Sequence, residues 1–164
     1  MREWDLGGEP MVIRRALLEE ILDLRYRVLI AGTARTSSEF AGDRAATTWH
    51  FGVFGHGRTV GCASLMRSEL DASAAWQLRG MAVEEDLRGR GVGSALLRAI
   101  EDAVAAESPL RLFWCNARVA AVAFYERHGW RRISDEFMIE GVGLHHRMRR
   151  DLATLAPGRS GPFP

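Results

Sequence analysis

The feature that most constrains this chain is a glycine-rich turn that leads directly into an apolar helical stripe. The turn reads Arg88-Gly89-Arg90-Gly91-Val92-Gly93-Ser94. Over residues 91–106 apolar side chains recur at the spacing of one helix face, which predicts a helix packed against a core. Strand-like runs over 75–83 and 110–115 flank this unit. The chain therefore places a strand, a glycine turn, a helix and another strand in succession.

The turn has the chemistry of an anion site. The first N–H groups of a helix have no intrahelical acceptor and carry partial positive charge. Glycines allow close approach of the backbone, and Arg88 and Arg90 add charge, so a pyrophosphate is the expected guest. A Gly-Lys-Ser phosphate loop is excluded because the chain has no lysine, and Ser94 replaces the third glycine of a dinucleotide fingerprint. A glycine turn without a ligand stays open as the alternative.

Other patterns predict the remaining elements of a single domain over residues 10–152. Strands are expected over 10–15, 49–54, 59–67, 130–133 and 144–152, and helices over 17–30 and 118–128, the last ended by Gly129. Residues 32–48 are expected to form a loop. Residues 1–9 and 153–164 are expected to be flexible ends. This order predicts a mixed sheet flanked by helices.

Composition limits the classes of function. The chain has 22 basic and 21 acidic residues, with 47% hydrophobic residues, so it lacks the basic excess of a nucleic-acid binder. No apolar run reaches the about 20 residues that span a bilayer, and the polar N-terminus is unlike a signal peptide. We therefore expect a cytoplasmic protein with neither nucleic acid nor membrane as partner. Cys62 and Cys115 make no zinc pattern, and we expect no metal and two buried thiols.

Three segments resemble one known family. Arg88-x-x-Gly91-x-Gly93 resembles the Arg/Gln-x-x-Gly-x-Gly/Ala signature of the GNAT N-acetyltransferase superfamily. Residues 78–83 resemble the fourth strand of that family, and residues 114–130 resemble the unit with an Asn at a strand end and Phe-Tyr in a short helix. The resemblance implies an α/β (α+β) fold. Its sheet would be mixed, mostly antiparallel and twisted, with six to seven strands flanked by helices and with splayed fourth and fifth strands.

The resemblance also implies an activity. It implies transfer of an acetyl group from acetyl-CoA, the cosubstrate, to a primary amine of a small molecule or peptide, by direct attack in a ternary complex. Backbone groups of Met81 and Val83 would hold the pantetheine arm, and the Val83 N–H would polarise the thioester carbonyl. The implied cofactor-binding residues are Met81, Ala82, Val83, Arg88, Gly89, Arg90, Gly91, Val92, Gly93, Ser94, Asn116, Phe124 and Tyr125.

Three residues are predicted to be catalytic. Tyr125 would protonate the leaving thiolate, since a phenol with a pKa of about 10 can donate to a basic thiolate; the alternative is a core tyrosine bonded to a backbone carbonyl. Asn116 would bond the cofactor arm or fix the splay, and would also cap the next helix. His145 is the first choice of general base. The alternatives are His50, Glu84, Glu136 and a water chain.

Several alternatives stay open. The chain could be a catalytically silent acyl-CoA-binding or regulatory module of the same fold, or an unrelated nucleotide-binding protein. Cys115 as a covalent nucleophile carries little weight, because a strand-buried thiol is usually inert. Arg25 and Arg27 could meet an acidic acceptor, but a solvated helix face is the preferred interpretation. The sequence does not identify the acceptor, and a homodimer is expected only because many members of the family dimerise.

Overall fold

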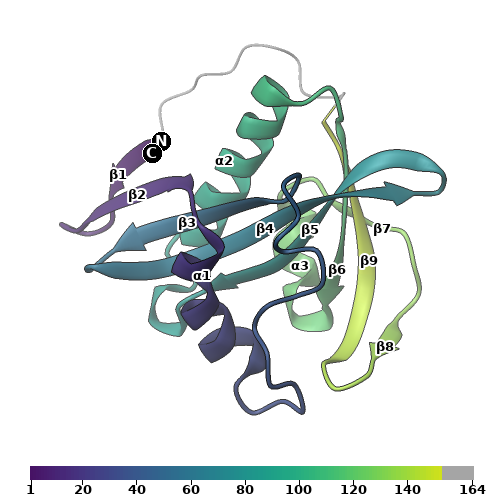
Figure 1. Ribbon diagram of the computed structural model, residues 1–164, viewed down its shortest axis with the longest axis horizontal. Helices are drawn as coiled ribbons and strands as arrows, with labels where there is room; N and C mark the ends of the chain where they lie inside the picture. The colour runs from purple at the N-terminus through teal and green to yellow at the C-terminus, as the bar shows by residue number, and fades with distance from the viewer. Residues whose placement is uncertain (153–164) are drawn as a thin grey trace.

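The computed structural model describes residues 1–152, which fold into a nine-stranded sheet with helices on both faces (Figure 1). The strands are β1 (Arg2–Asp5), β2 (Pro10–Arg15), β3 (Trp49–Gly55), β4 (Arg58–Leu70), β5 (Ser73–Val83), β6 (Leu112–Arg118), β7 (Arg131–Arg132), β8 (Phe137–Ile139) and β9 (Gly143–Asp151). The helices are α1 (Leu18–Arg25), the π-helix η1 (Tyr26–Ile30), the 3-10 helix η2 (Glu85–Leu87), α2 (Val92–Glu107), the 3-10 helix η3 (Val119–Ala121) and α3 (Val122–Arg127).

The strand order is β1-β2-β3-β4-β5-β6-β9-β7, and β8 pairs with β9. Among the described strands every neighbouring pair is antiparallel except β5 and β6. The predicted mixed, mostly antiparallel sheet is therefore confirmed. Gly129, which was predicted to end the last helix, follows α3 with a φ of 79°.

The sheet contains β1 and β8, which were not predicted, so it exceeds the expected six to seven strands. Residues 1–9 were expected to be loose, but Arg2–Asp5 pairs with β2. Trp4 explains this difference, because its side chain packs against the main core and holds the edge strand to the sheet. The predicted tail, residues 153–164, lies outside the described part of the chain.

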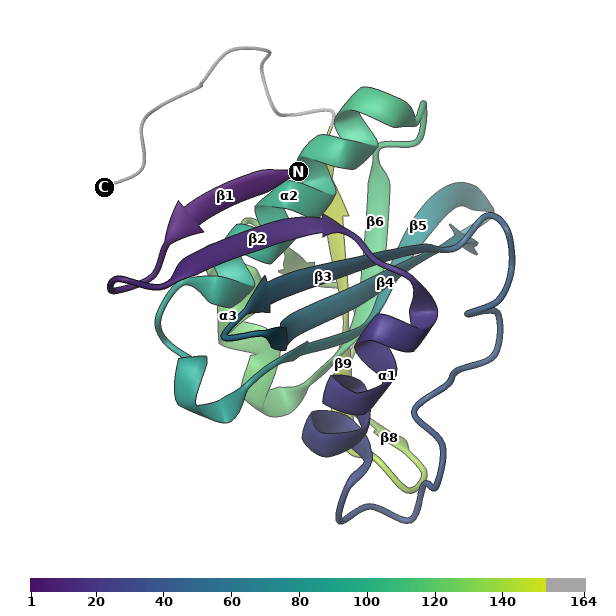
Figure 2. The ribbon, with the colours of Figure 1, turned by 60° about the vertical axis from the view of Figure 1, so that its left-hand side comes forward.

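The two faces of the sheet have separate hydrophobic cores. On one face the apolar stripe of α2 packs against α3 and the central strands, through Val92, Leu96, Ile100 and Val104. On the other face α1 packs against Cys62 of β4 and Ala82 of β5, through Leu18, Ile21 and Leu24. Figure 2 shows α1 on one side of the strands and α2 and α3 on the other. The ends of β5 and β6 therefore lie between two helical layers.

β5 contains a bulge at Gly80. The register between β4 and β5 shifts there, so β5 has one extra residue. Gly80 has a φ of 59°, a conformation that favours glycine. The extra residue inverts the alternation of side chains. Trp76 and Leu78 pack on the α2 side before the bulge, and Met81 and Val83 pack on the same side after it.

A buried polar cluster lies between α1 and the sheet, and we call Arg25, Asp43, His50 and Ser64 the Arg25 cluster. The side chains of Arg25 and Asp43 are fully buried and form an ion pair. Arg25 also donates to Ser64 Oγ, His50 Nδ1 lies 2.6 Å from that oxygen, and His50 Nε2 donates to the Asp43 carbonyl at 2.9 Å. A Cβ at Gly80 would lie 2.8 Å from Arg25 Nε. The prediction of a solvated face was wrong for Arg25.

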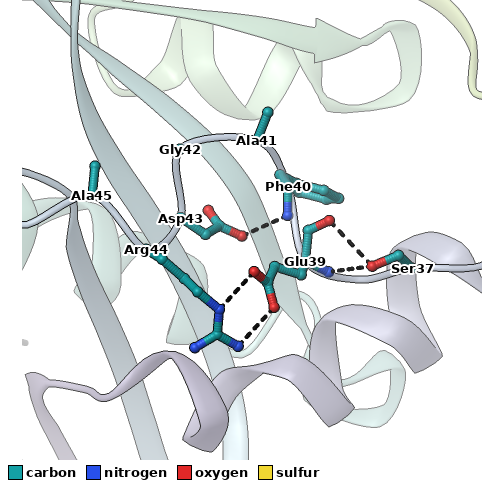
Figure 3. A pocket seen from close by; sticks show the side chains of 8 residues that line it. All are labelled: Ser37, Glu39, Phe40, Ala41, Gly42, Asp43, Arg44 and Ala45. Carbon is teal, nitrogen blue, oxygen red and sulfur yellow. Dashed lines mark hydrogen bonds and ion pairs between the residues drawn. The ribbon is translucent and has the colours of Figure 1, made fainter.

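The Arg25 cluster also anchors the loop over residues 31–48, which contains no helix or strand, as predicted. Asp43 accepts the N–H of Phe40 at 2.7 Å, and Arg25 donates to the Ser38 carbonyl at 3.1 Å. Figure 3 shows this turn, together with the exposed pair between Arg44 and Glu39 on its outer side. The buried ion pair between Arg25 and Asp43 therefore anchors the loop to the sheet side, and the exposed pair between Arg44 and Glu39 links two positions on its outer side.

Removing one partner of the buried pair should destabilise the fold strongly. In Asp43→Ala the guanidinium of Arg25 stays buried without a counter-charge, and we expect the free energy of unfolding to fall by about 3–5 kcal/mol. Glu39→Ala is the matched control, because it breaks an exposed pair worth about 1 kcal/mol or less. Urea unfolding measures both. Equal stability of Asp43→Ala and wild type would contradict this account of the cluster.

Candidate active site

The glycine-rich turn presents an open backbone at the start of α2. Gly89 and Gly91 have φ values of 74° and 88°, and a Cβ at either position would meet no atom within 4 Å. Gly91 is the N-cap residue, and the amide of Ala95 bonds back to its carbonyl at 2.9 Å. The amides of residues 92–94 precede that bond, so they point out of the helix toward the turn. This arrangement suits an anion.

β5 and β6 pair at only two positions and then part. The parallel register joins Trp76 to Phe113 and Gln77 to Trp114, and β5 continues to Val83 without further pairing to β6. Figure 1 shows the two strands diverging beyond this point. The parted strands that the resemblance implied are thus present.

The edge of β5 that faces the opening carries unpaired backbone groups. The N–H of Glu84 donates to the Val60 carbonyl at 2.9 Å, so residue 84 faces β4. Backbone groups of successive residues point to alternate sides of a strand, so those of Met81 and Val83 point away from β4. Arg88 Nε donates to the Val83 carbonyl at 3.4 Å. The Met81 and Val83 N–H groups therefore line an edge to which a strand-like ligand can add.

Tyr125 reaches the opening from α3. Its hydroxyl donates to Met81 Sδ on β5 at 3.6 Å and lies against the thiol of Cys115 on β6. Burial, and then the neighbouring Cys115, raise the pKa of Tyr125 well above its usual range, so the phenol stays protonated at neutral pH. A Cβ at Gly93 would lie 3.4 Å from the ring of Phe124, which places the glycine turn beside α3. The turn, the strand edge and the phenol are therefore adjacent.

Asn116 lies within β6, between Cys115 and Ala117. Its Oδ1 atom is buried, and it has no hydrogen-bond partner among residues 1–152. Such an oxygen can accept a bond from a ligand. The predicted helix-capping role was wrong, because Arg118 and Ala121 are the N-cap residues of η3 and α3.

His145 lies on β9 directly opposite Arg118, the last residue of β6, and its side chain is buried. Its Nδ1 lies 2.7 Å from the Gly143 carbonyl. A carbonyl only accepts, so Nδ1 is the donor in this bond, and in the neutral ring Nε2 is the nitrogen with a lone pair. His145 therefore offers a proton acceptor at the end of the parted strands.

The other candidate bases are engaged elsewhere or exposed. Both ring nitrogens of His50 are bonded inside the Arg25 cluster, and burial lowers its pKa, so the ring stays neutral. Glu84 pairs with Arg27 at 2.7 Å and with Arg58 at 3.4 Å. Glu136 is exposed. Among the described candidates, His145 alone is a buried base with a ring nitrogen that bonds no protein group.

A depression of about 370 Å³ lies on the loop and is lined by residues 37 and 39–45 (Figure 3). It contains none of the predicted site residues. Its side chains bond to one another, as the dashed lines between Arg44 and Glu39 show. Within the described part of the chain, no three His, Cys, Asp or Glu side chains gather as metal ligands. No helix in that part is both long and apolar enough to cross a membrane.

Two features of the site escaped sequence reasoning. The bulge at Gly80 was missed, although an isolated glycine inside a strand pattern is a signal for one. The arginines on the α1 side of the sheet, Arg79, Arg118 and Arg147, were also missed. The signal for Arg118 and Arg147 was the period-two alternation of β6 and β9, which separates core-facing positions from those on the opposite face.

Comparison with known proteins identifies relatives of this chain. The family model described as acetyltransferase (GNAT) domain matches residues 47–132. An uncharacterized N-acetyltransferase of Bacillus subtilis, YitI, is 31% identical over 145 residues, which cover 87% of this chain and 97% of that protein. The match therefore spans most of both chains.

Solved structures share the fold. ElaA of Escherichia coli superposes with a TM-score of 0.70 at 18% identity, over 87% of this chain and 99% of that one. A GNAT family acetyltransferase from Elizabethkingia anophelis with acetyl-CoA bound superposes with a TM-score of 0.64 at 13% identity, over 87% and 98%. At these sequence identities the similarity shows a shared fold alone.

The two thiols should be unreactive in the folded protein. Cys62 and Cys115 are buried and unbridged. Burial raises the pKa of Cys62 to about 12 and raises that of Cys115 well above its usual range, so little thiolate is present at pH 8. We expect an aromatic disulfide reagent to titrate neither thiol in buffer and both in denaturant. Rapid reaction of Cys115 in the native state would instead make a covalent acyl-cysteine route tenable.

Proposed function

Because this chain belongs to the GNAT acetyltransferase family, we propose that it transfers an acetyl group from acetyl-CoA to a primary amine of a small molecule or peptide. The observation that carries the proposal is the position of the Tyr125 hydroxyl between the parted strands, 3.6 Å from Met81 Sδ. Tyr125 belongs to the main core, as its alternative interpretation expected, but its hydroxyl bonds a sulfur and not a backbone carbonyl. A protonated phenol at this point is what a leaving thiolate needs.

The residues present fit the cofactor. Acetyl-CoA supplies, when bound, an acyl thioester and a diphosphate. The amides of residues 88–94 hold the diphosphate, supported by the open positions at Gly89 and Gly91 and by the start of α2. The side chains of Arg88 and Arg90 stand beside this turn and add positive charge. No atom of the described chain lies within 4 Å of a Cβ built at Gly89 or Gly91, so an anion can approach the backbone at both glycines.

The β5 edge holds and polarises the acyl arm. Met81 and Val83 present their N–H groups toward the opening, so they pair with the amides of the arm as an added strand would. The Val83 N–H lies near the end of this edge and stabilises negative charge on the carbonyl oxygen. Asn116 accepts a further hydrogen bond through its unpartnered Oδ1. These contacts fix the carbonyl between β5 and β6.

Proton transfer falls to Tyr125 and His145. Tyr125 gives its proton to the departing sulfur, and the burial that raises its pKa also raises that of a thiolate held beside it. His145 Nε2 takes the proton of the attacking amine. The amine attacks the thioester directly in a ternary complex. Burial makes the Cys115 thiol a poor nucleophile, and this argues against a covalent acyl-cysteine intermediate.

A catalytically silent acyl-CoA-binding module is the alternative, and turnover separates the two. Free thiol released from acetyl-CoA is measured over a panel of amines, polyamines, amino acids and peptides. Amine-dependent release supports the enzyme. Saturable CoA binding without release of thiol to any amine would support the module, and absence of CoA binding would contradict both.

Tyr125→Phe should separate the role of the Tyr125 hydroxyl as a proton donor from the role of its ring in packing. The substitution keeps the buried ring and removes the hydroxyl, so we expect kcat to fall by about 100-fold or more while the Kd for CoA changes by less than about twofold. Tyr26→Phe is the control, because it removes the hydroxyl of the other tyrosine, which lies on η1 and is exposed. Steady-state thiol release and calorimetric CoA titration measure the two quantities. Wild-type kcat in Tyr125→Phe would contradict the role of the phenol.

A further inference from the structure

One face of β6 and β9 gathers polar side chains around the proposed base. Alternate residues of β6 pack into the main core, so Asn116 and Arg118 face the opposite way, toward α1. Arg147 lies directly opposite Asn116, and His145 lies directly opposite Arg118. Directly opposite residues share a face of the sheet. Two arginines therefore flank His145 on the α1 side of the sheet.

Arg118 is fixed by one bond and keeps its remaining donors. Its Nη2 donates to the Leu29 carbonyl of η1 at 3.0 Å, which ties the end of β6 to the segment after α1. Among residues 1–152 its other N–H groups have no acceptor. Burial, and then the nearby guanidinium of Arg35, lower the pKa of Arg118. The side chain is thus held in an environment that disfavours its charge unless an anion joins it.

Arg147 shows the same deficit on β9. Its guanidinium carbon lies 5.1 Å from the centroid of the Trp114 ring, which holds the side chain against the sheet. Its Nε is buried and has no hydrogen-bond partner within the described chain. A buried donor without an acceptor is costly, and native proteins leave few of them. This donor can therefore take a partner that the described residues do not supply.

Two further arginines enclose the region from the loop and from β5. Arg35 and Arg79 lie over the same ring, with guanidinium carbons 4.6 Å and 5.4 Å from the Phe40 centroid. The carboxylate of Asp43 is already bound by Arg25 and lies 3.5 Å from Arg79. The two acidic side chains of the loop are therefore engaged by Arg25 and Arg44, and neither forms an ion pair with Arg35.

Arg79 lies near Asp43, but no carboxylate of the described residues pairs with the other three arginines. None of the ion pairs within residues 1–152 includes Arg35, Arg118 or Arg147. Of the acidic side chains near them in sequence, Glu39 pairs with Arg44 at 2.8 Å and Asp151 lies 3.8 Å from Arg149. Glu136 and Glu140 are exposed and form no ion pair within residues 1–152. An uncompensated cationic surface beside the reaction centre selects for substrates of opposite charge.

We propose that the acceptor amine carries an anionic group, a carboxylate or a phosphate, and that Arg118 and Arg147 bind this group beside His145. The inference rests on the proposed function, because it assigns the acceptor of the same site. The planar guanidinium fork matches both anions and binds them through paired hydrogen bonds. The opposite partners Arg118 and His145 have Cβ atoms about 5 Å apart, so the amine and the anion are close together in one small molecule or at one chain end.

The direct test compares amines that differ only in the anion. The wild-type protein is assayed with the standard L-amino acids and their amides, with O-phosphoethanolamine and ethanolamine, and with cadaverine. We expect kcat/KM for the best anionic amine to exceed that of its neutral partner by about tenfold or more. The amino acid pair and the phosphoethanolamine pair tell a carboxylate from a phosphate. Equal use of both members of each pair, or a preference for cadaverine, would overturn the inference.

The two proposals fail in different ways. Acetylation of neutral or cationic amines alone leaves the proposed function standing and overturns the anionic acceptor. CoA binding without acetylation of any amine overturns the proposed function, and the acceptor assignment falls with it. Acetylation confined to anionic amines supports both.

Substitutions then locate the anion site. We expect Arg147→Gln to lower kcat/KM for the anionic amine and to bring the ratio of kcat/KM between anionic and neutral partners to within about twofold of unity. Arg67→Gln is the matched control, because Arg67 lies over the ring of Trp76 at 5.0 Å, near the β4–β5 hairpin and away from the parted ends. Unchanged selectivity in both Arg147→Gln and Arg118→Gln would overturn the assignment.

A measurement on the wild-type protein avoids any effect of substitutions on folding. The N-acetylated product of the best anionic amine should inhibit at a concentration about tenfold lower than its amide does, because the product keeps the anion. Equal inhibition by the acid and the amide would contradict an anion site beside His145.

Discussion

β5 and β6 pair at only two positions, Trp76–Phe113 and Gln77–Trp114. The candidate site lies beyond the second pair, where the two strands part. Where the ladder ends, the β5 edge has backbone donors without strand partners. The start of α2 presents further donors beside the same edge, and Tyr125 places a hydroxyl between the two strands. A bound acyl arm would complete the interrupted ladder, so backbone pairing both recruits the ligand and sets where its carbonyl lies.

Contacts on the α1 side of the sheet fix the backbone of β5 at Gly80, and this backbone sets which β5 side chains face α2. The Arg25 cluster fills the space above Gly80, where any side chain would collide with Arg25. The bulge at Gly80 inverts the alternation of β5 and directs Met81 toward Tyr125. A buried ion pair is weak evidence for stability in itself, because desolvation offsets much of its attraction. Here it serves to hold the loop over residues 31–48 and the bulge in one geometry.

Sequence reasoning predicted the elements whose signals are local. The stripe of α2, the helix stop at Gly129 and the open glycine turn depend on spacing and on backbone conformation, and all three are present. Features that depend on contacts distant in sequence were missed. The burial of Arg25 needs an acid 18 residues away, β1 needs the core surface that receives Trp4, and the position of Asn116 inside β6 depends on pairing with β9. Periodicity does not encode such partners.

In the proposed function, the open edge of β5 and the start of α2 together hold CoA. Amide hydrogen exchange with and without CoA tests it most directly, because it reports each backbone donor separately. We expect CoA to slow exchange at Met81, Val83 and residues 92–94, and to leave the amide of Gly57 in the β3–β4 turn unchanged. Unaltered exchange at residues 81–83 and 92–94 under saturating CoA would contradict it.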